Sequence, residues 1–260
     1  MKHYFTLLAA VILIVGLLSG CSKPETDTDE KSVELTISAA ASLQDSLEEI
    51  KEAYEKEHTN ITIHYNFGGS GALQQQILQG APVDLFLSAA EDKFDALIEK
   101  GFIDQKQKIN LLANELVLIV PKTNEKHIQS FEDVKLSEKI ALGTPETVPA
   151  GQYGLETLNN MQLWEEVKSK VVYTKDVRQV LTYTETENVD AGIVYKTDAL
   201  TSDKVEVVAT ANDDTHTPII YPVGIVKDSK SVEAAEDFYD FLQSEEAMEV
   251  FVEYGFKQAN

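Results

Sequence analysis

The fold of this chain is decided by one stretch, Leu35-Thr36-Ile37-Ser38-Ala39-Ala40-Ala41-Ser42-Leu43. It begins as an apolar strand, and the apolar residues after it take the spacing of a helix, at Leu43, Leu47, Ile50 and Tyr54. Ser42 therefore lies where a strand passes into a helix. The first turn of a helix has backbone N–H groups without partners, and the peptide dipoles make that end positive. Ser42 is predicted either to cap the helix or to turn its hydroxyl toward an anion.

A second corner of the same kind follows. Residues 61–65 alternate between apolar and polar as in a half-buried strand, and Gly68-Gly69-Ser70-Gly71 then leads into helical spacing. Val83–Leu87 reads as a buried strand before a third helix. Three strand–helix units in a row predict a parallel sheet, whose ligands bind at the carboxyl ends of its strands. Ser42 and Ser70 both fall at that end.

The pattern starts again at Leu116–Val120 and finishes with an apolar strand, Ile219–Val226, that Pro222 is expected to break. We therefore predict an α/β protein of two lobes, each a mostly parallel sheet flanked by helices. Lobe 1 comprises residues 33–115 plus 222–260, and lobe 2 comprises residues 116–221. A chain that crosses between lobes twice is expected to bind its ligand in the cleft between them.

The N-terminal residues are predicted to be a targeting segment. Residues 1–20 contain a short apolar run, Leu7–Leu18, that is typical of a signal peptide. Ser19-Gly20-Cys21 resembles the lipobox of bacterial lipoproteins, which implies that Cys21 carries lipid. Residues 21–32 have the polar composition of a flexible tether. The protein is thus expected to be exported and anchored by lipid to the outer face of the cell membrane.

The charge of the chain argues against one class of partner. Its formal net charge is −22, whereas nucleic acid requires a basic face. Nucleic acid is therefore not expected to bind.

Catalysis and metal binding have weaker signals. Gly68-Gly69-Ser70-Gly71-Ala72 nearly matches the nucleophile elbow of serine hydrolases, but the last glycine is missing and His216, the one late histidine, lies in a polar loop. The histidines have no paired spacing, and no cysteine follows Cys21. Tyr195 and Tyr221 with a carboxylate are a conceivable ferric-iron site, although the chain lacks an adjacent tyrosine pair. Neither an enzyme nor a cation site is the favoured interpretation.

The remaining candidate groups are neutral donors. They are the hydroxyls of Ser42, Ser70 and Tyr195, together with backbone N–H groups at the helix starts after Ala150 and Asp176. Such a set suits a compact, fully deprotonated oxyanion, because every ligand oxygen accepts hydrogen bonds and none offers a proton. A buried carboxylate would instead favour a protonated anion.

Six motifs in one order carry a resemblance to a known family. The chain resembles the extracytoplasmic molybdate-binding proteins of ABC transporters, in a lipoprotein form, from Val33 to Phe256. The motifs are Ala39-Ala40-Ala41-Ser42-Leu43, Gly80-Ala81-Pro82-Val83-Asp84-Leu85-Phe86, Val148-Pro149-Ala150-Gly151, Asp176-Val177-Arg178, Gly192-Ile193-Val194-Tyr195 and Tyr254-Gly255-Phe256.

The resemblance implies a periplasmic-binding-protein-like fold and a set of ligand residues. Carried over motif by motif, these residues are Ser42, Ser70, Ala150, Val177 and Tyr195. It further implies a monomeric binding protein that is not an enzyme, has no cofactor, binds molybdate or tungstate, and delivers the oxyanion to a membrane permease. Sulfate or another oxyanion stays open as the ligand, and ferric iron as a weaker alternative.

Overall fold

The computed structural model of the protein describes residues 32–259. The predicted signal peptide, Cys21 and nearly all of the predicted tether lie outside the described residues. The described residues form one compact unit. None of the helices in the described part of the chain is long and apolar enough to cross a membrane.

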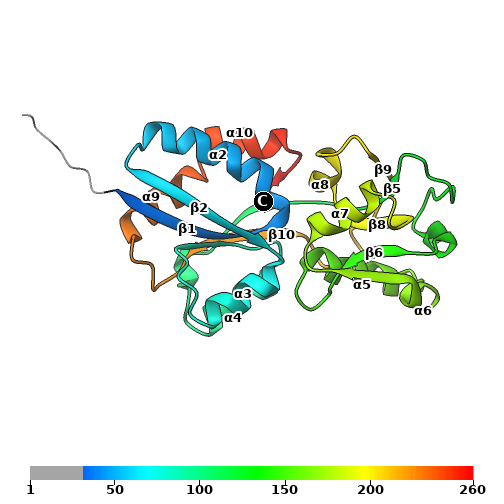
Figure 1. Cartoon of the computed structure of the whole chain (residues 1–260). Helices are drawn as coiled ribbons and strands as arrows, with labels where there is room; N and C mark the ends of the chain where they lie inside the picture. The colour runs from blue at the N-terminus through cyan, green and yellow to red at the C-terminus, as the bar shows by residue number, and fades with distance from the viewer. Residues whose placement is uncertain (1–31, 260) are drawn as a thin grey trace, which may run out of the picture. The chain divides into compact units, whose positions relative to one another are not determined.

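One sheet contains the first strands and the C-terminal ones (Figure 1). Its order is β11-β4-β10-β3-β1-β2. The strands are β1 (Val33–Ala40), β2 (Ile61–Gly68), β3 (Leu85–Leu87), β4 (Ile109–Ala113), β10 (Ile220–Ile225) and β11 (Lys257–Gln258). Its helices are α2 (Gln44–Glu57), α3 (Ser70–Leu78), α4 (Glu91–Glu99), α9 (Val232–Phe241) and α10 (Glu245–Glu253).

Both faces of this sheet are covered. Helices α2, α9 and α10 lie over one face, and α3 and α4 over the other (Figure 1). The apolar side chains of α3 and α4 form a separate cluster around Phe86 and Phe94, whose stacked rings are 5.7 Å apart. Burial on both faces explains why β3 reads as a continuous apolar run in the sequence.

The second sheet lies within the middle of the chain. Its order is β7-β6-β8-β5-β9. The strands are β5 (Leu116–Pro121), β6 (Ile140–Gly143), β7 (Val171–Thr174), β8 (Ala191–Tyr195) and β9 (Val205–Thr210), and the helices are α5 (Pro149–Asn160), α6 (Trp164–Val167), α7 (Val177–Glu185) and α8 (Lys196–Leu200). Gly192 on β8 faces α7, where an added Cβ would lie 2.8 Å from Val180. Its neighbour Ile193 faces α5, where a Cβ added at Gly154 would lie 3.2 Å from it, so the two helices cover opposite faces.

Short 3₁₀ turns complete the elements: η1 (Ala41–Leu43), η2 (Gln105–Gln107), η3 (Glu132–Leu136) and η4 (Lys168–Lys170). Of these, η1 matters for the site, because it separates the end of β1 from the start of α2.

The α/β architecture with two sheets is confirmed, but the sheets are mixed and not mostly parallel. β1 pairs in parallel with β2 and β3, whereas β10 runs antiparallel to β3 and β4. In the second sheet β5 is antiparallel to both β8 and β9. The antiparallel strands adjoin the segments that pass from one sheet to the other. A strand that follows such a segment is not preceded by the crossover helix that parallel neighbouring strands require.

The last long strand also differs from its prediction. Pro222 does not break it, because β10 is continuous and the pairing register with β4 shifts between Tyr221 and Pro222. A bulge tolerates proline, since the missing N–H falls where no ladder bond is needed. The chain re-enters the first sheet at Ile220, where β10 begins.

Candidate ligand-binding site

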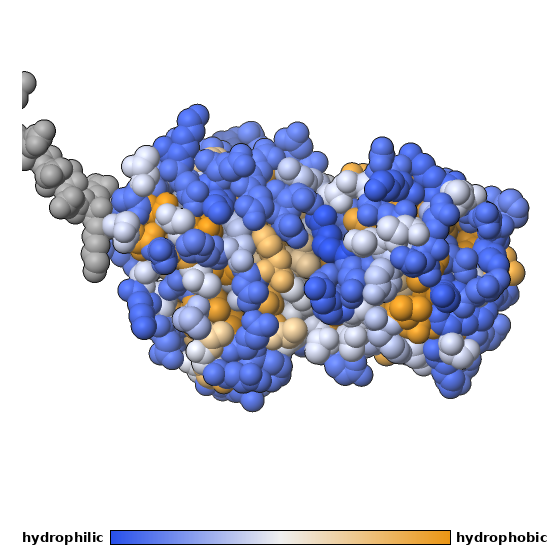
Figure 2. Space-filling model, in the orientation of Figure 1, coloured by the Kyte–Doolittle hydropathy of each residue, from blue (hydrophilic) through white to orange (hydrophobic). Residues whose placement is uncertain are grey.

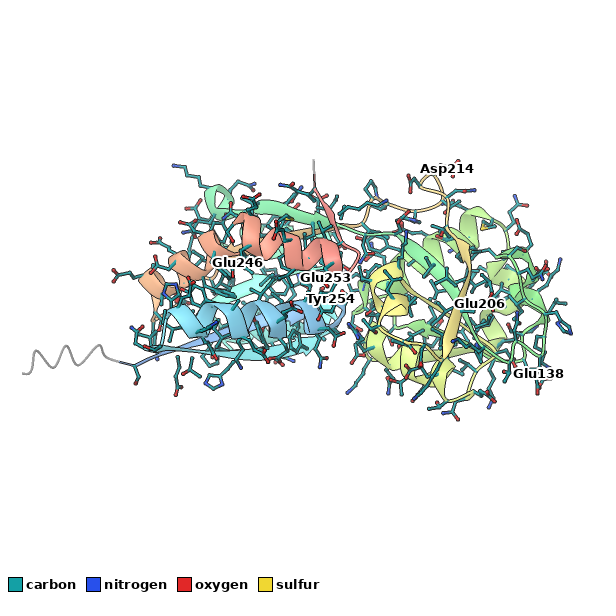
Figure 3. All side chains as sticks on the ribbon, turned by 90° about the horizontal axis from the view of Figure 1, so that it is seen from above. Glu138, Glu206, Asp214, Glu246, Glu253 and Tyr254 are labelled. Carbon is teal, nitrogen blue, oxygen red and sulfur yellow. The ribbon has the colours of Figure 1, made fainter. Side chains whose placement is uncertain are left out.

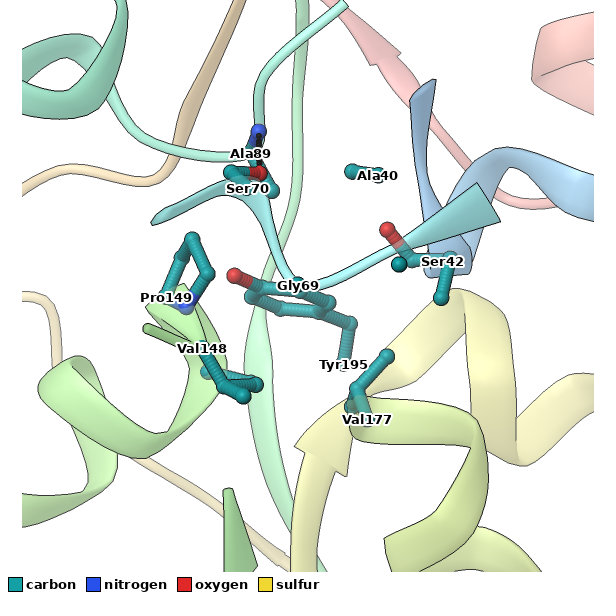
Figure 4. A pocket seen from close by; sticks show the side chains of 12 residues that line it. Ala40, Ser42, Gly69, Ser70, Ala89, Val148, Pro149, Val177 and Tyr195 are labelled. Carbon is teal, nitrogen blue, oxygen red and sulfur yellow. Dashed lines mark hydrogen bonds between the residues drawn. The ribbon is translucent and has the colours of Figure 1, made fainter. Parts of the chain in front are cut away.

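The five residues predicted from the sequence line one small pocket between the two sheets (Figure 4). Its cavity offers about 10 Å³ to the centre of a water-sized sphere, which is room for roughly one water molecule. The lining residues have no charged side chain and are Ala40, Ala41, Ser42, Gly68, Gly69, Ser70, Ala89, Val148, Pro149, Ala150, Val177 and Tyr195. A site of this size and polarity suits a compact ligand.

Ser42 does not cap a helix. It lies in η1, and neither η1 nor α2 has a side-chain cap, so the capping interpretation is wrong. The Ser42 hydroxyl instead lies 2.9 Å from that of Tyr221 on β10, and Ser42 is 3% exposed. In Figure 4 the Ser42 side chain stands at the edge of the pocket near Ala40.

Ser70 is the first residue of α3 and is completely buried. Its Oγ accepts a hydrogen bond of 2.9 Å from the backbone N–H of Ala89, which follows β3 (Figure 4). Because a hydroxyl has one proton, this bond leaves the Ser70 proton available to a ligand.

The second sheet supplies two helix starts. Ala150 is the second residue of α5, and Pro149 before it has no N–H, so the amide of Ala150 is the first of that helix. Val177 is the first residue of α7, whose cap Asp176 accepts from the N–H of Gln179 at 2.8 Å. The amides of Ala150 and Val177 thus belong to first turns, where N–H groups have no partner within the helix. With the start of α3, three positive helix ends meet at this pocket.

Tyr195 ends β8, and its ring reaches into the pocket (Figure 4). The residue is 1% exposed, yet its hydroxyl has no hydrogen-bond partner among the described residues. Burial raises the pKa of this phenol well above its ordinary value, so the group stays neutral. A buried hydroxyl without a partner is costly, which makes it a strong indication of a ligand.

The two sheets also meet through main chain beside the pocket. The N–H of Gly71 donates a hydrogen bond of 2.9 Å to the carbonyl of Thr147, which precedes α5. A Cβ added at Gly71 would lie 2.8 Å from the Cα of Thr147, and one at Gly69 would lie 2.6 Å from the Thr147 carbonyl oxygen. These glycines therefore permit a contact that no side chain would fit.

Arg178 forms ion pairs that link helices of the two sheets. Arg178 on α7 lies 2.6 Å from Asp45 on α2 and 2.8 Å from Asp198 on α8. The Arg178 Nε and the Asp198 oxygen are close but not aligned as a hydrogen bond. Asp198 is completely buried, and this burial raises its pKa to about 6, against the opposing effect of Arg178.

A family model described as bacterial extracellular solute-binding protein matches residues 35–257. The chain belongs to this family. It is therefore a binding protein of the extracellular solute-binding class, and its relatives are not enzymes.

Three relatives illustrate the range of this solute-binding family. The chain is 58% identical, over 98% of both chains, to YvgL of Bacillus subtilis, named as a candidate ABC transporter substrate-binding lipoprotein. It is 36% identical to the molybdate-binding protein ModA of Haemophilus influenzae, over 86% of this chain and 90% of that one. The solved substrate-binding domain of a candidate molybdenum ABC transporter from Clostridium difficile is 42% identical, with a TM-score of 0.67, over 88% of this chain and 100% of that one.

Sequence reasoning missed part of the lining of this solute-binding protein. Ala89 lies at the carboxyl end of β3, where it donates to Ser70, and Ala40 and Ala41 close the end of β1. Their position after buried strands is a signal that could have identified them. Tyr221, which the sequence offered only for a ferric-iron site, bonds to Ser42 from outside the lining, and Asn114 bonds to Tyr221 in turn. No local pattern marks Asn114.

The alternative chemistries gain little from the structure. The pocket lining contains no histidine or carboxylate, so Ser70 has no base beside it there. Within residues 32–259 no group of three histidine, cysteine or acidic residues is placed to hold a metal ion. Tyr221 is engaged with Ser42 and Asn114.

Proposed function

We propose that this solute-binding protein binds molybdate, and tungstate as its close analogue, in the pocket around Ser42 and Tyr195, and delivers it to an ABC permease. The proposal rests chiefly on one observation. Neutral donors from both sheets converge on a single small cavity, and one of them, the Tyr195 hydroxyl, is buried without a partner. The names of the relatives in Haemophilus influenzae and Clostridium difficile support the same ligand class.

The donor set matches a tetrahedral oxyanion in chemistry. The hydroxyls of Ser42, Ser70 and Tyr195 and the amides of Ala150 and Val177 approach from different elements, so that separate ligand oxygens can each accept bonds. The ligand charge is balanced by helix ends and oriented dipoles, without a lysine or arginine in the lining. Fixed dipoles in a closed site stabilise a charge more effectively than water at the surface does.

The filter against sulfate is proposed to be the size that the cavity takes when a ligand is bound, since the cavity described above has room for only about one water molecule. Sulfate and molybdate carry the same charge and the same need for donors, but sulfate is smaller. A smaller anion leaves donors stretched, at a cost of roughly 1 to 3 kcal/mol for each buried group left unpaired.

Ferric iron is disfavoured by the composition of the pocket lining. A ferric ion takes several anionic ligands, whereas the lining contains one tyrosine, Tyr195, and no carboxylate, and Tyr221 lies outside it. The neutral phenol of Tyr195 is better suited to donate a hydrogen bond to an anion.

We further propose that residues 33–115 plus 222–260 and residues 116–221 act as two lobes that close over the ligand. The contact between Gly71 and Thr147 and the ion pair between Arg178 and Asp45 would then belong to the closed form. A lipid on Cys21 and a tether over residues 21–32 would hold the monomeric receptor near its permease. The lipoprotein name of the Bacillus subtilis relative supports this anchor.

The deciding experiment is calorimetric titration of the chain from residue 33 onward with molybdate, tungstate, sulfate and phosphate. One-to-one binding of molybdate and tungstate, with sulfate and phosphate silent or much weaker, is the expected result. If the chain preferred sulfate, the proposed ligand would change, but the proposal of an oxyanion-binding protein would stand. Silence with all four anions would refute the oxyanion proposal.

A further inference from the structure

Asn114 lies between β4 and β5, at one of the passages from the first sheet to the second. Its Oδ1 accepts a hydrogen bond of 2.9 Å from the backbone N–H of Glu115, which fixes the orientation of the amide. The Nδ2 group therefore faces the hydroxyl oxygens of Thr197, at 2.9 Å, and of Tyr221, at 3.2 Å. An amide nitrogen can only donate, so Tyr221 receives a hydrogen bond from Asn114.

The proton of Tyr221 must then go to another partner. Tyr221 is 1% exposed, and among the described residues its hydroxyl has hydrogen-bond geometry only with Asn114 and Ser42, although the ring of Tyr195 lies 5.9 Å from its own. Since Asn114 offers a donor, the Tyr221 proton is directed at the Ser42 Oγ, 2.9 Å away. Burial raises the pKa of this phenol well above its ordinary value, so the proton is present at neutral pH.

Ser42 is thereby left with one direction for its own proton. Its oxygen accepts from Tyr221, and its hydroxyl is on the pocket lining, so the proton points at the ligand. The N–H of Ala89 donates to the Ser70 Oγ, so the Ser70 proton is directed at the ligand in the same way. A ligand oxygen that carries a proton would point that proton at the serine proton. The two donors would repel each other, and no hydrogen bond could form at these two serines.

We propose that Asn114 and Tyr221 are positioning residues that commit Ser42 to donate, and that this chain of hydrogen bonds makes the pocket select anions without a proton. The inference rests on the proposed oxyanion-binding function and explains a part of its specificity that cavity size does not provide. Neither residue lines the pocket.

The test compares molybdate with phosphate at about pH 8, where phosphate is mainly a dianion that bears one proton. Molybdate affinity is measured by titration, and phosphate affinity by competition against molybdate. For Tyr221→Phe we expect the preference for molybdate over phosphate to fall by about tenfold, because the freed Ser42 oxygen can accept from the ligand. The ring of Tyr221, 5.4 Å from that of Phe256, is preserved by this change.

Asn114→Asp independently tests the direction of the hydrogen bonds that run from Asn114 through Tyr221 to Ser42. A carboxylate only accepts, so Tyr221 would donate to it and Ser42 would donate to Tyr221, away from the pocket. The added negative charge repels two dianions alike, so it cancels from the ratio of affinities. We expect this ratio to fall at least as far as in Tyr221→Phe.

The matched control is Tyr65→Phe, which removes a hydroxyl that donates to the Leu47 carbonyl at 2.9 Å, away from the pocket. Its ratio should equal that of the natural chain. If the natural chain binds molybdate and the variants at positions 114 and 221 lose affinity for both anions equally, the role of these residues is merely structural and the inference is overturned. If the natural chain binds neither anion, the proposed function itself has failed.

Discussion

Two pocket hydroxyls, those of Ser42 and Tyr195, are both buried but differ in their partners. Ser42 already has a hydrogen bond to Tyr221, whereas the Tyr195 hydroxyl has none among the described residues. The same kind of substitution, removal of one oxygen, should therefore affect folding at one position and not at the other, while both should weaken binding.

Ser42→Ala is expected to weaken molybdate binding by at least tenfold, because a ligand oxygen loses its donor in a closed site. Titration of the variant measures this loss. Ser46→Ala is the matched control, since Ser46 is equally buried in α2 but bonds to the carbonyl of Leu43 outside the lining. Unchanged affinity in Ser42→Ala would remove Ser42 from the site.

Tyr195→Phe should weaken binding without lowering the melting temperature of the ligand-free protein. The hydroxyl that it removes makes no hydrogen bond to the described residues, so folding loses nothing when it goes. Thermal unfolding with and without molybdate separates the two effects. A lower melting temperature combined with unchanged affinity would show that the hydroxyl serves the fold instead.

The carboxyl of Asp198 should make stability depend on pH. Burial raises its pKa from 3.8 to about 6 in the folded protein, so folding favours the protonated form. Its contribution is fully present below about pH 4 and is lost as the pH rises through about 6, by roughly 3 kcal/mol in all. The free energy of unfolding of the natural chain, relative to Asp198→Asn, should fall over that window. A difference that stays constant with pH would contradict the assignment.

At the scale of elements, strand ends and helix starts were predictable and strand directions were not. The end of β1 and the starts of α3, α5 and α7 carry local signals in small residues, proline and changes of periodicity. Strands β7 and β9 escaped prediction because they are sheet edges whose side chains are mostly half-buried or exposed, which weakens the apolar pattern. The antiparallel course of β5 and β10 follows from the passage between sheets, a tertiary property.

The same distinction applies to the site. All five residues carried over from the family motifs line the pocket, since each stands at a corner that the sequence marks locally. Their role in ligand binding stays a prediction. The bond between Ser42 and Tyr221 joins residues 179 positions apart, so no local signal could have predicted it.

The start of α7 offers a test at this scale. Asp176→Ala removes the acceptor for the Gln179 N–H and should cost about 0.5 to 2 kcal/mol of folding stability. It should also weaken molybdate binding, because Val177 begins the helix that this cap fixes. Denaturant unfolding and titration measure the two effects. Asp176→Asn keeps an acceptor and serves as control, and equal losses in both variants would exclude the capping explanation.

At the scale of the whole molecule, an anion site is surrounded by a strongly acidic surface. The net charge of the chain is −22, and the face shown in Figure 2 is mostly hydrophilic. Exposed carboxylates lie around both sheets, among them Glu138, Glu206, Asp214, Glu246 and Glu253 (Figure 3). The surface charges are screened beyond about 8 Å at physiological ionic strength, whereas donors in contact with the ligand are not.

Added salt is therefore expected to raise the association rate of molybdate, because it screens a repulsive field. Stopped-flow measurements over a range of sodium chloride concentrations test this. A rate that falls with salt would reveal an attractive, basic entrance to the site.

The contact between Gly71 and Thr147 has a consequence for transport in the living cell. This seam is sealed by backbone against backbone, and a Cβ at position 71 would be 2.8 Å from the Thr147 Cα. Under the proposed function, a bulky side chain at position 71 would keep the two lobes apart. The receptor would then stay empty, but it would still compete with the natural protein for the permease. Produced beside the natural protein, such a chain would act as a dominant-negative inhibitor of uptake.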